Sequence, residues 1–367
     1  MVRRAFDFCF TILERACPWL FCLGLALTFV HHGWMCCRVL PEWVDPAIHL
    51  VQRAPKYLCY LCLLSMLRRH PWYLVASVAV LWMLHLGWEH SGRGTLFNSA
   101  LLILASRGCG QRRILWIFLC ALVAQFLVAH IGYWCGIMGD LTKHRYGLAG
   151  HSWGTSSPNM WAAIVMVVTM LSLQLCRTRR TVVIAGVCCL VAVVVLATTL
   201  SITTVLTLLA LPVIYGLLVR WPHVACWAAA LPWLGLAVSL ALMWYYGPSL
   251  GETTFESRFS MGAMAMERYG VSWMGQDCGH LDFSRAQELG VEAFCLDNLY
   301  LQLLFYFGLL PMALVLSYFS YTLCRIARSR DWLLLALSVC FVLTGMMEAY
   351  PLFATMNFAL YAKIINN

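Results

Sequence analysis

Residues 181–219 read TVVIAGVCCLVAVVVLATTLSITTVLTLLALPVIYGLLV and contain no charged side chain. A helix that crosses the hydrocarbon layer of a membrane, roughly 30 Å thick, needs about 20 largely apolar residues. The stretch is therefore long enough for two such helices, near 181–198 and 202–219. It predicts a pair of consecutive membrane spans in the middle of the chain.

Apolar runs of this kind recur from one end of the chain to the other. The 367 residues are 62% hydrophobic and 11% charged, which is too little charge to cover the surface of a soluble domain. We therefore predict one all-α polytopic membrane domain, 1–367, with about 11–12 transmembrane helices. The runs lie near 17–35, 49–67, 71–88, 95–107, 114–134, 159–176, 181–198, 202–219, 224–246, 298–320 and 332–350, with a short or re-entrant segment at 352–364.

The arginines indicate which side of the membrane each helix end faces. Cytoplasmic loops of membrane proteins carry an excess of Lys and Arg, and the arginine groups of this chain fall at alternate ends of consecutive spans. They are Arg3 with Arg4, Arg68 with Arg69, Arg107 with Arg112 and Arg113, Arg177 with Arg179 and Arg180, Arg220, and Arg325 with Arg328 and Arg330. We assign these ends to the cytoplasm. Because they account for the formal charge of +9, we do not expect a nucleic-acid partner. The first span, which no small-residue cleavage site follows, is expected to be an uncleaved signal anchor.

A smaller set of cations is predicted on the extracytoplasmic side, against this bias: Arg38, Arg53, Arg93, Lys143, Arg145, Arg258, Arg268 and Arg285. The last five belong to two long polar loops, at about 135–158 and about 247–297. Cations that oppose the topological bias need a functional explanation, so we look for the active residues in these two loops.

The first loop carries three glycines and five hydroxyl side chains between 143 and 158, which argues against a regular helix. Ser157 is expected to cap the next helix, with Pro158 in its first turn. Arg145 offers a fork of donors that matches phosphate oxygens, and His151 offers an imidazole. The alternative is a hydrated loop whose arginine meets lipid headgroups.

The second loop contains a segment, 257–270, whose apolar residues favour one face at helical spacing. It predicts an amphipathic helix at the membrane interface that carries Arg258 and Arg268. Asp297 is a natural cap for the helix that follows it. Glu348 lies near the outer end of an apolar helix, where a carboxylate is costly unless it is paired or faces water. An arginine of the loops could reach it, and an inert carboxylate at the interface is the alternative.

Several side chains could also bind metal or form a disulfide. Asp277, His280 and Asp282 have a spacing that could hold a divalent cation, but solvation is the expected fate of polar residues in such a loop. His31, His32, Cys36 and Cys37 could form a metal cluster, although a membrane-exit segment is the expected interpretation. Cys278 and Cys295 could be bridged or could both be free thiols.

Arginines, a histidine and a carboxylate beside apolar helices suit an anionic lipid, in particular a lipid diphosphate. Arginines would neutralise the diphosphate and stabilise it as a leaving group, and a carboxylate or imidazole would accept the proton of an attacking sugar hydroxyl.

The order of the polar motifs resembles that of the O-antigen and capsule polysaccharide polymerases (Wzy type), and more distantly that of the O-antigen ligases. The matching stretches, within about 140–360, are Arg145-Tyr146-Gly147, Ser157-Pro158-Asn159, Ser257-Arg258, Met274-Gly275, Asp297-Asn298-Leu299-Tyr300, Gly308-Leu309-Leu310, and the pair Glu348 and Asn357. The chain departs from the family in two places. No arginine accompanies Ser201, and Ser157 replaces a histidine before Pro-Asn, so that His151 can take its role only if the loop folds back.

The resemblance implies an extracytoplasmic glycosyltransferase of the class C membrane fold, in a bacterial cytoplasmic membrane, that needs no metal and no nucleotide sugar. Its substrate would be an undecaprenyl-diphosphate-linked oligosaccharide, and a flippase and a chain-length regulator would be its pathway partners. The substrate-binding residues would be Arg145, Asn159, Arg258, Arg268, Asp297, Asn298 and Tyr300, and the candidate bases Glu348 and His151. An O-antigen ligase and a transporter of lipid-linked sugar remain the alternatives. A transporter would commonly show paired helix breaks in two related halves, and no half-repeat is visible.

Overall fold

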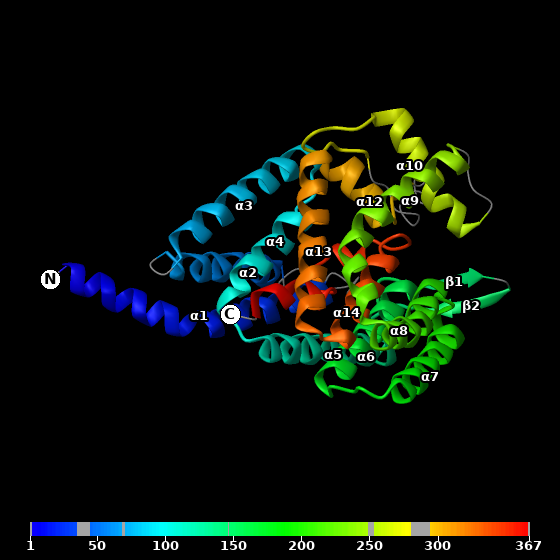
Figure 1. Cartoon of the computed structure of the whole chain (residues 1–367), viewed down its shortest axis with the longest axis horizontal. Helices are drawn as coiled ribbons and strands as arrows, with labels where there is room; N and C mark the ends of the chain where they lie inside the picture. Colours follow the sequence, from blue (N-terminus) through cyan, green and yellow to red (C-terminus); the bar gives the residue numbers. More distant parts are fainter. Residues whose placement is uncertain are drawn as a thin grey trace. The chain divides into compact units, whose positions relative to one another are not determined.

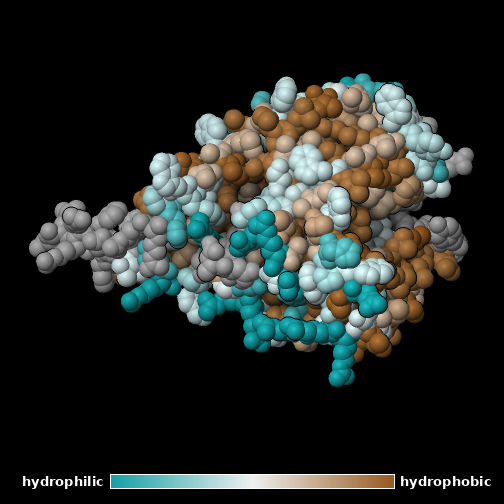
Figure 2. Space-filling view, viewed as in Figure 1, coloured by the Kyte–Doolittle hydropathy of each residue, from teal (hydrophilic) through white to brown (hydrophobic). Residues whose placement is uncertain are grey.

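The computed structural model of the chain describes residues 2–34, 45–67, 70–145, 147–248, 253–279 and 294–365. These residues form an almost entirely helical protein (Figure 1). Eight of the described helices are long and apolar enough to cross a membrane: Thr11–Phe29, Pro71–Ser91, Gln111–Trp134, Pro158–Leu175, Thr181–Thr199, Ile202–Arg220, Pro222–Tyr246 and Leu309–Ser329. Large apolar side chains remain exposed along them, and apolar surface covers much of the face in Figure 2. The chain is therefore an all-α polytopic membrane protein.

The chain divides into two compact units. The first unit comprises Met1–Val78, Ala100–Arg220 and Ala354–Asn367. Its elements are α1 (Val2–Trp34), α2 (Asp45–Ser65), the start of α3 (Pro71–Ser91), α5 (Gln111–Trp134), strands β1 (Thr142–Arg145) and β2 (Leu148–His151), α6 (Pro158–Leu175), α7 (Thr181–Thr199), α8 (Ile202–Arg220) and a final 3-10 segment, Phe358–Ile365.

Aromatic rings build the part of the first unit's core that holds this final segment. The Phe118 ring meets both Phe29 and Tyr361 nearly edge-on, with ring centroids 5.3 Å apart in each case. Phe21 and Tyr361 are also fully buried. The segment predicted at 352–364 as a short or re-entrant membrane element thus contains a 3-10 segment, Phe358–Ile365, that packs into this core. A separate 3-10 turn, Tyr350–Leu352, ends where the predicted segment begins and contains Pro351, which lacks a backbone N–H.

The second unit comprises Ala79–Ser99 and Trp221–Phe353. It contains the rest of α3, the start of α4 (Thr95–Ala105), a 3-10 segment (Pro222–Ala230) that runs into α9 (Leu231–Tyr246), α10 (Thr254–Tyr269), α12 (Leu299–Gln302), a π-helical turn (Leu303–Phe307), α13 (Leu309–Ser329), α14 (Trp332–Thr344) and a 3-10 turn (Tyr350–Leu352).

The structure corrects the predicted span at 298–320, which is not one helix. Gly308 has φ +86° and separates the π-helical turn from α13. A Cβ at Gly308 would lie 2.4 Å from the Gly275 nitrogen, and one at Gly275 would lie 2.5 Å from the Tyr306 carbonyl oxygen. The helix breaks here because the backbone around Gly308 and the backbone around Gly275 lie too close together for a side chain at either position. The sequence gives no sign of this break, because apolar residues lie on both sides of Gly308. The span expected at 332–350 is also shorter, since α14 ends at Thr344.

Replacing Gly308 with alanine is expected to destabilise the protein by about 2–4 kcal/mol. The substitution adds the strain of a left-handed backbone to a direct overlap with Gly275. Gly186→Ala is the matched control, because a Cβ added there, in the middle of α7, would meet no atom within 4 Å. The measurement is the thermal midpoint of the purified protein. Equal midpoints for the two variants would contradict the packing described here.

Candidate functional site

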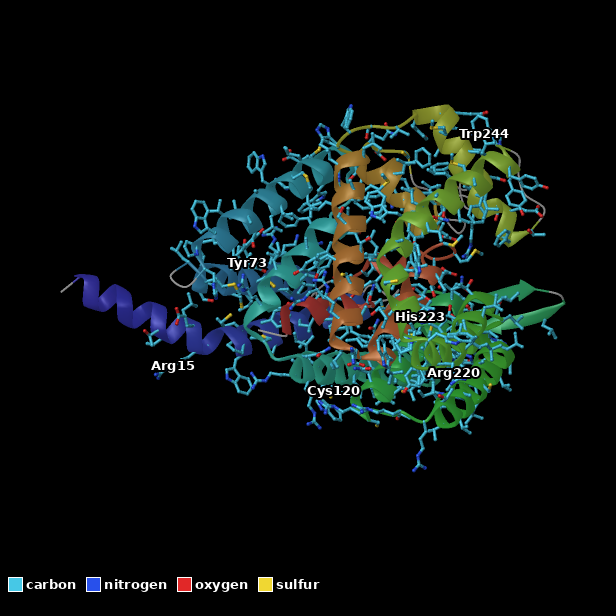
Figure 3. All side chains as sticks on the ribbon, viewed as in Figure 1. Arg15, Tyr73, Cys120, Arg220, His223 and Trp244 are labelled. Carbon is cyan, nitrogen blue, oxygen red and sulfur yellow. The ribbon has the colours of Figure 1, made fainter. Side chains whose placement is uncertain are left out.

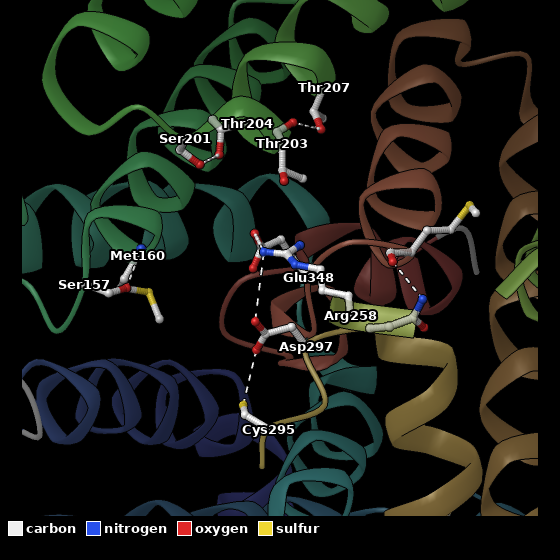
Figure 4. A network of polar contacts seen from close by, with 12 residues as sticks. Ser157, Met160, Ser201, Thr203, Thr204, Thr207, Arg258, Cys295, Asp297 and Glu348 are labelled. Carbon is white, nitrogen blue, oxygen red and sulfur yellow. Dashed lines mark hydrogen bonds and ion pairs between the residues drawn. The ribbon is translucent and has the colours of Figure 1, made fainter. Parts of the chain in front are cut away.

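Arg258 lies in the first turns of α10, whose start is fixed by a capping box between Thr253 and Glu256. Only 5% of the Arg258 side chain is exposed, and its Nη2 atom donates a 2.9 Å hydrogen bond to Oε1 of Glu348. The Oδ2 atom of Asp297 lies 4.0 Å from the same nitrogen (Figure 4). An arginine of the polar loops thus does reach Glu348, as the sequence indicated it could, and this arginine is Arg258.

Two of the three guanidinium nitrogens of Arg258 are unpaired within the described part of the chain. Its Nε and Nη1 atoms are buried and have no hydrogen-bond partner among the described residues. A guanidinium presents five N–H donors, and leaving buried donors unsatisfied costs free energy. The site therefore offers a fixed guanidinium with spare donors, beside two carboxylates of which Glu348 is 12% and Asp297 46% exposed. Such an arginine suits a second anion, above all a planar or tetrahedral oxyanion that takes two donors at once.

The structure corrects the predicted cap of the helix that follows Asp297. The capping residue is Asn298, whose Oδ1 atom accepts hydrogen bonds from the backbone N–H groups of Tyr300 and Leu301. Asparagine and aspartate are equally good N-cap residues, and Asn298 is the residue directly before α12. The Asp297 carboxylate therefore points elsewhere: Oδ2 lies near Arg258, and Oδ1 accepts a bond of 3.3 Å from the Cys295 thiol (Figure 4).

Asn298 and Tyr300 hold the segment in place. The Asn298 amide nitrogen donates to Oγ of Ser239 at 3.0 Å and to the Met346 carbonyl oxygen at 2.7 Å. The hydroxyl group of Tyr300, which is fully buried, donates to the Val342 carbonyl oxygen at 2.8 Å. Asn298 thus bonds to α9 and to the residues just after α14, and Tyr300 bonds to α14 itself. That both bind substrate stays a prediction.

The glycines that the resemblance singled out, Gly275 and Gly308, support the same region. The backbone N–H groups of Leu309 and Leu310 donate to the carbonyl oxygens of Ser272 and Trp273, at 3.0 and 3.1 Å. This pairing ties the middle of the second polar loop to the start of α13.

A second polar cluster lies in the first unit, around a β-hairpin in the first polar loop. Strands β1 and β2 pair antiparallel, with Thr142 opposite His151 and Arg145 opposite Leu148. The hairpin packs closely on the end of α7, because a Cβ at Gly150 would lie 2.4 Å from the Thr199 carbonyl oxygen. The prediction of a non-helical loop is confirmed, while the hairpin itself was not predicted.

Asp140, which the sequence did not single out, organises this cluster. Its Oδ2 atom lies 2.5 Å from Nδ1 of His151. Its Oδ1 atom accepts hydrogen bonds from the backbone N–H groups of Ser152 and Trp153, at 2.8 and 3.1 Å, and from the Ser152 hydroxyl at 3.2 Å. Since a carboxylate can only accept, Nδ1 of His151 carries the proton in this pair. Nε2 of the neutral ring is then the nitrogen with a free lone pair.

Comparison with models of protein families, with curated proteins and with solved structures finds no match for this chain. The chemistry of the two clusters is therefore interpreted from their own geometry. The second unit offers a buried guanidinium for an anion, and the first offers an imidazole held by a carboxylate. Neither cluster brings together three or more potential metal ligands in the described residues.

The other predicted residues lie as follows. Asn159 is in the first turn of α6, where the predicted cap is confirmed: Ser157 Oγ accepts from the Met160 N–H at 3.1 Å. Arg268 is exposed in the last turn of α10. Arg145 lies in β1, but its side chain is outside the described residues.

The candidate metal and disulfide residues are only partly described. Cys278 and Cys295 are both thiols and are not bridged to each other. Asp277 is exposed, with Oδ1 accepting from the Gly279 N–H at 2.9 Å. His280 and Asp282, and Cys36 and Cys37 of the other cluster, lie outside the described residues.

The hairpin is expected to loosen in acid. Burial raises the pKa of the Asp140 carboxyl group, but hydrogen bonds from His151 and from the Trp153 and Ser152 N–H groups outweigh this effect and lower the pKa below its usual 3.8. A lowered folded-state pKa stabilises the hairpin above pH 3.8 and ceases to do so as the pH falls through the folded value. Hydrogen exchange at the Ser152 and Trp153 amides, corrected for the intrinsic rate, should accelerate below that pH. The Asp140→Asn variant should show fast exchange at every pH, and a wild-type profile without an acid transition would contradict the assignment.

Proposed function

We propose that the chain is a membrane glycosyltransferase that polymerises lipid-linked oligosaccharide repeat units at the outer face of a bacterial cytoplasmic membrane. The observation that carries this proposal is Arg258: a guanidinium that is 5% exposed, paired on one nitrogen with Glu348 and unpartnered on Nε and Nη1 within the described chain. Arg258 belongs to a loop that we assign to the extracytoplasmic side, where the positive-inside rule predicts few cations. A lipid diphosphate supplies oxyanions for those donors and an apolar tail for the surrounding membrane.

The proposed reaction moves a growing glycan from one carrier lipid to the sugar end of another lipid-linked repeat unit. An acceptor hydroxyl oxygen forms a bond to the anomeric carbon of the donor sugar, and the bond from that carbon to the diphosphate oxygen breaks. The electron pair of the broken bond leaves with undecaprenyl diphosphate, whose added charge Arg258 stabilises. The proton of the hydroxyl goes to a base.

The two candidate bases differ in their surroundings. Glu348 shares a 2.9 Å hydrogen bond with Arg258, so its carboxylate is already engaged in holding the guanidinium. His151 is held on Nδ1 by Asp140 and keeps Nε2 for a proton. In the first unit, His151 is the proposed base; in the second unit, Arg258 is proposed to bind the diphosphate, with Glu348 and Asp297 orienting its guanidinium. Arg145, Asn159 and Arg268 are proposed as further contacts to the lipid-linked sugar, and a flippase and a chain-length regulator as partners in the pathway.

The test is an elongation assay. Purified protein in lipid vesicles is given synthetic undecaprenyl-diphosphate repeat units, and the products are sized on a gel. A ladder of products supports polymerisation. Transfer to a different acceptor, without a ladder, would identify a ligase, and movement of the carrier across the vesicles without any new glycosidic bond would identify a transporter.

A further inference from the structure

A groove of about 570 Å³ lies between α1 and α5 in the first unit, and no residue of either polar cluster lines it. Its α1 side is formed by Cys22, Ala26 and Phe29. Its α5 side is formed by residues that recur at helical spacing and so make one stripe: Arg113, Trp116, Ile117, Cys120, Ala121, Ala124, Gln125 and Val128. Cys120 is labelled on α5 in Figure 3. The groove exists because small side chains, Ala26 on one helix and Ala121 and Ala124 on the other, face a gap that larger residues would fill.

One end of the groove has the chemistry of a membrane interface. The Arg113 guanidinium lies over the Trp19 ring, 5.1 Å from its centroid, and the exposed Trp116 lines the groove one turn further on. Tryptophan and arginine gather where the hydrocarbon layer meets the headgroups. Arg113 belongs to the arginine group at 107–113 that the charge bias assigns to the cytoplasmic side. This end therefore lies at the level of the inner-leaflet headgroups.

The rest of the groove is apolar apart from Gln125, and its length suits one acyl chain. From Arg113 to Val128 is fifteen residues, or roughly 22 Å at 1.5 Å per residue. That distance exceeds one leaflet of a hydrocarbon layer roughly 30 Å thick, so that an acyl chain can lie along it almost fully extended.

We propose that this groove binds an anionic phospholipid of the inner leaflet, with its phosphate at Arg113 and one acyl chain along α5. The Arg113 guanidinium attracts an anionic headgroup, and the apolar stripe of α5 can pack against an acyl chain. The proposal does not depend on the glycosyltransferase function, because it uses no residue of the two polar clusters.

Two pairs of variants test it. Arg113→Gln removes the cation, and Arg112→Gln is its control, because Arg112 is the neighbouring exposed arginine and does not line the groove. Ala124→Phe fills the groove, and Leu127→Phe is its control, because Leu127 is exposed on the same helix outside the lining. Each protein is purified in mild detergent from membranes of defined composition, and bound phosphatidylglycerol is counted by native mass spectrometry.

The wild type and both controls should retain about one phosphatidylglycerol per chain. Arg113→Gln should retain about fivefold less phosphatidylglycerol, which is the effect of removing one cation at an anionic membrane surface. Ala124→Phe should reduce the bound phosphatidylglycerol at least as strongly. Equal losses for Arg112→Gln and Arg113→Gln would overturn the proposal in favour of general charge attraction. Retention unchanged by Ala124→Phe, equal retention of phosphatidylcholine, or a polyprenyl lipid in the place of the phospholipid would also overturn it.

Discussion

Replacing Arg258 with lysine should slow glycan elongation by about 10²–10³-fold while leaving a folded protein. Lysine keeps a positive charge for Glu348 but has no fork of planar donors for the diphosphate. The loss of a preorganised donor at a site of developing negative charge typically costs this much in rate. The measurement is the initial rate of elongation of a synthetic lipid-linked repeat unit, together with the thermal midpoint of the variant.

Two further variants separate catalysis from folding. Arg258→Ala removes the 2.9 Å hydrogen bond to the Glu348 carboxylate, which is 12% exposed, and breaking a buried ion pair in this way destabilises by about 3–5 kcal/mol. It should therefore fail in both activity and stability. Glu267→Gln is the matched control, because Glu267 is exposed on the same helix. If Arg258→Lys elongates glycan as fast as Glu267→Gln does, Arg258 does not bind the diphosphate.

The Asp140→Asn variant should lose about 10²–10⁴-fold in elongation rate, which is the range for losing general-base catalysis or its orienting carboxylate. An asparagine can present its NH₂ group to His151, which favours the wrong tautomer. Asp140 acts through His151 and is a positioning residue, so Asp140→Glu should restore part of the rate. The independent readout is the ¹⁵N spectrum of the histidine side chains, in which the Nδ1–H form of His151 should give way to a mixture.

His151→Ala should lose as much rate as Asp140→Asn, and the double variant little more, since the two residues act as a unit. Added imidazole should rescue His151→Ala and leave Asp140→Asn unchanged. Additive losses in the double variant, or a normal rate in Asp140→Asn with the altered tautomer, would show that the pair is structural.

The sequence predicts the membrane class and most helix positions, because a membrane span is a local property. About 20 consecutive apolar residues identify it, whatever the helix packs against. The cap at Ser157 is local in the same sense and was also predictable. The break at Gly308 was not, since it arises from an approach to Gly275, which is distant in the chain. Similarly, Asn298 rather than Asp297 caps α12 because its amide also satisfies Ser239 and Met346, and both partners belong to other parts of the unit.

The candidate site divides in the same way. Arg258 and Glu348 could be chosen as candidates from the cost of charge in a membrane. The sequence allowed a pairing between a loop arginine and Glu348, but it did not identify Arg258, which lies 90 residues away, as the partner. Asp140 was missed because a single aspartate in a polar loop gives no periodic signal. Only the hairpin register, which returns His151 to a position opposite Thr142, brings it to the imidazole.

The most direct test of the proposed function is the stoichiometry of the reaction. Protein in vesicles is supplied with a radiolabelled undecaprenyl-diphosphate repeat unit, and released undecaprenyl diphosphate and new glycosidic bonds are counted in the same samples. We predict one lipid diphosphate released for each bond formed, and neither product from the Arg258→Lys variant above its slow residual rate. Carrier lipid that crosses the vesicle membrane with no bond formed and no diphosphate released would contradict the proposal.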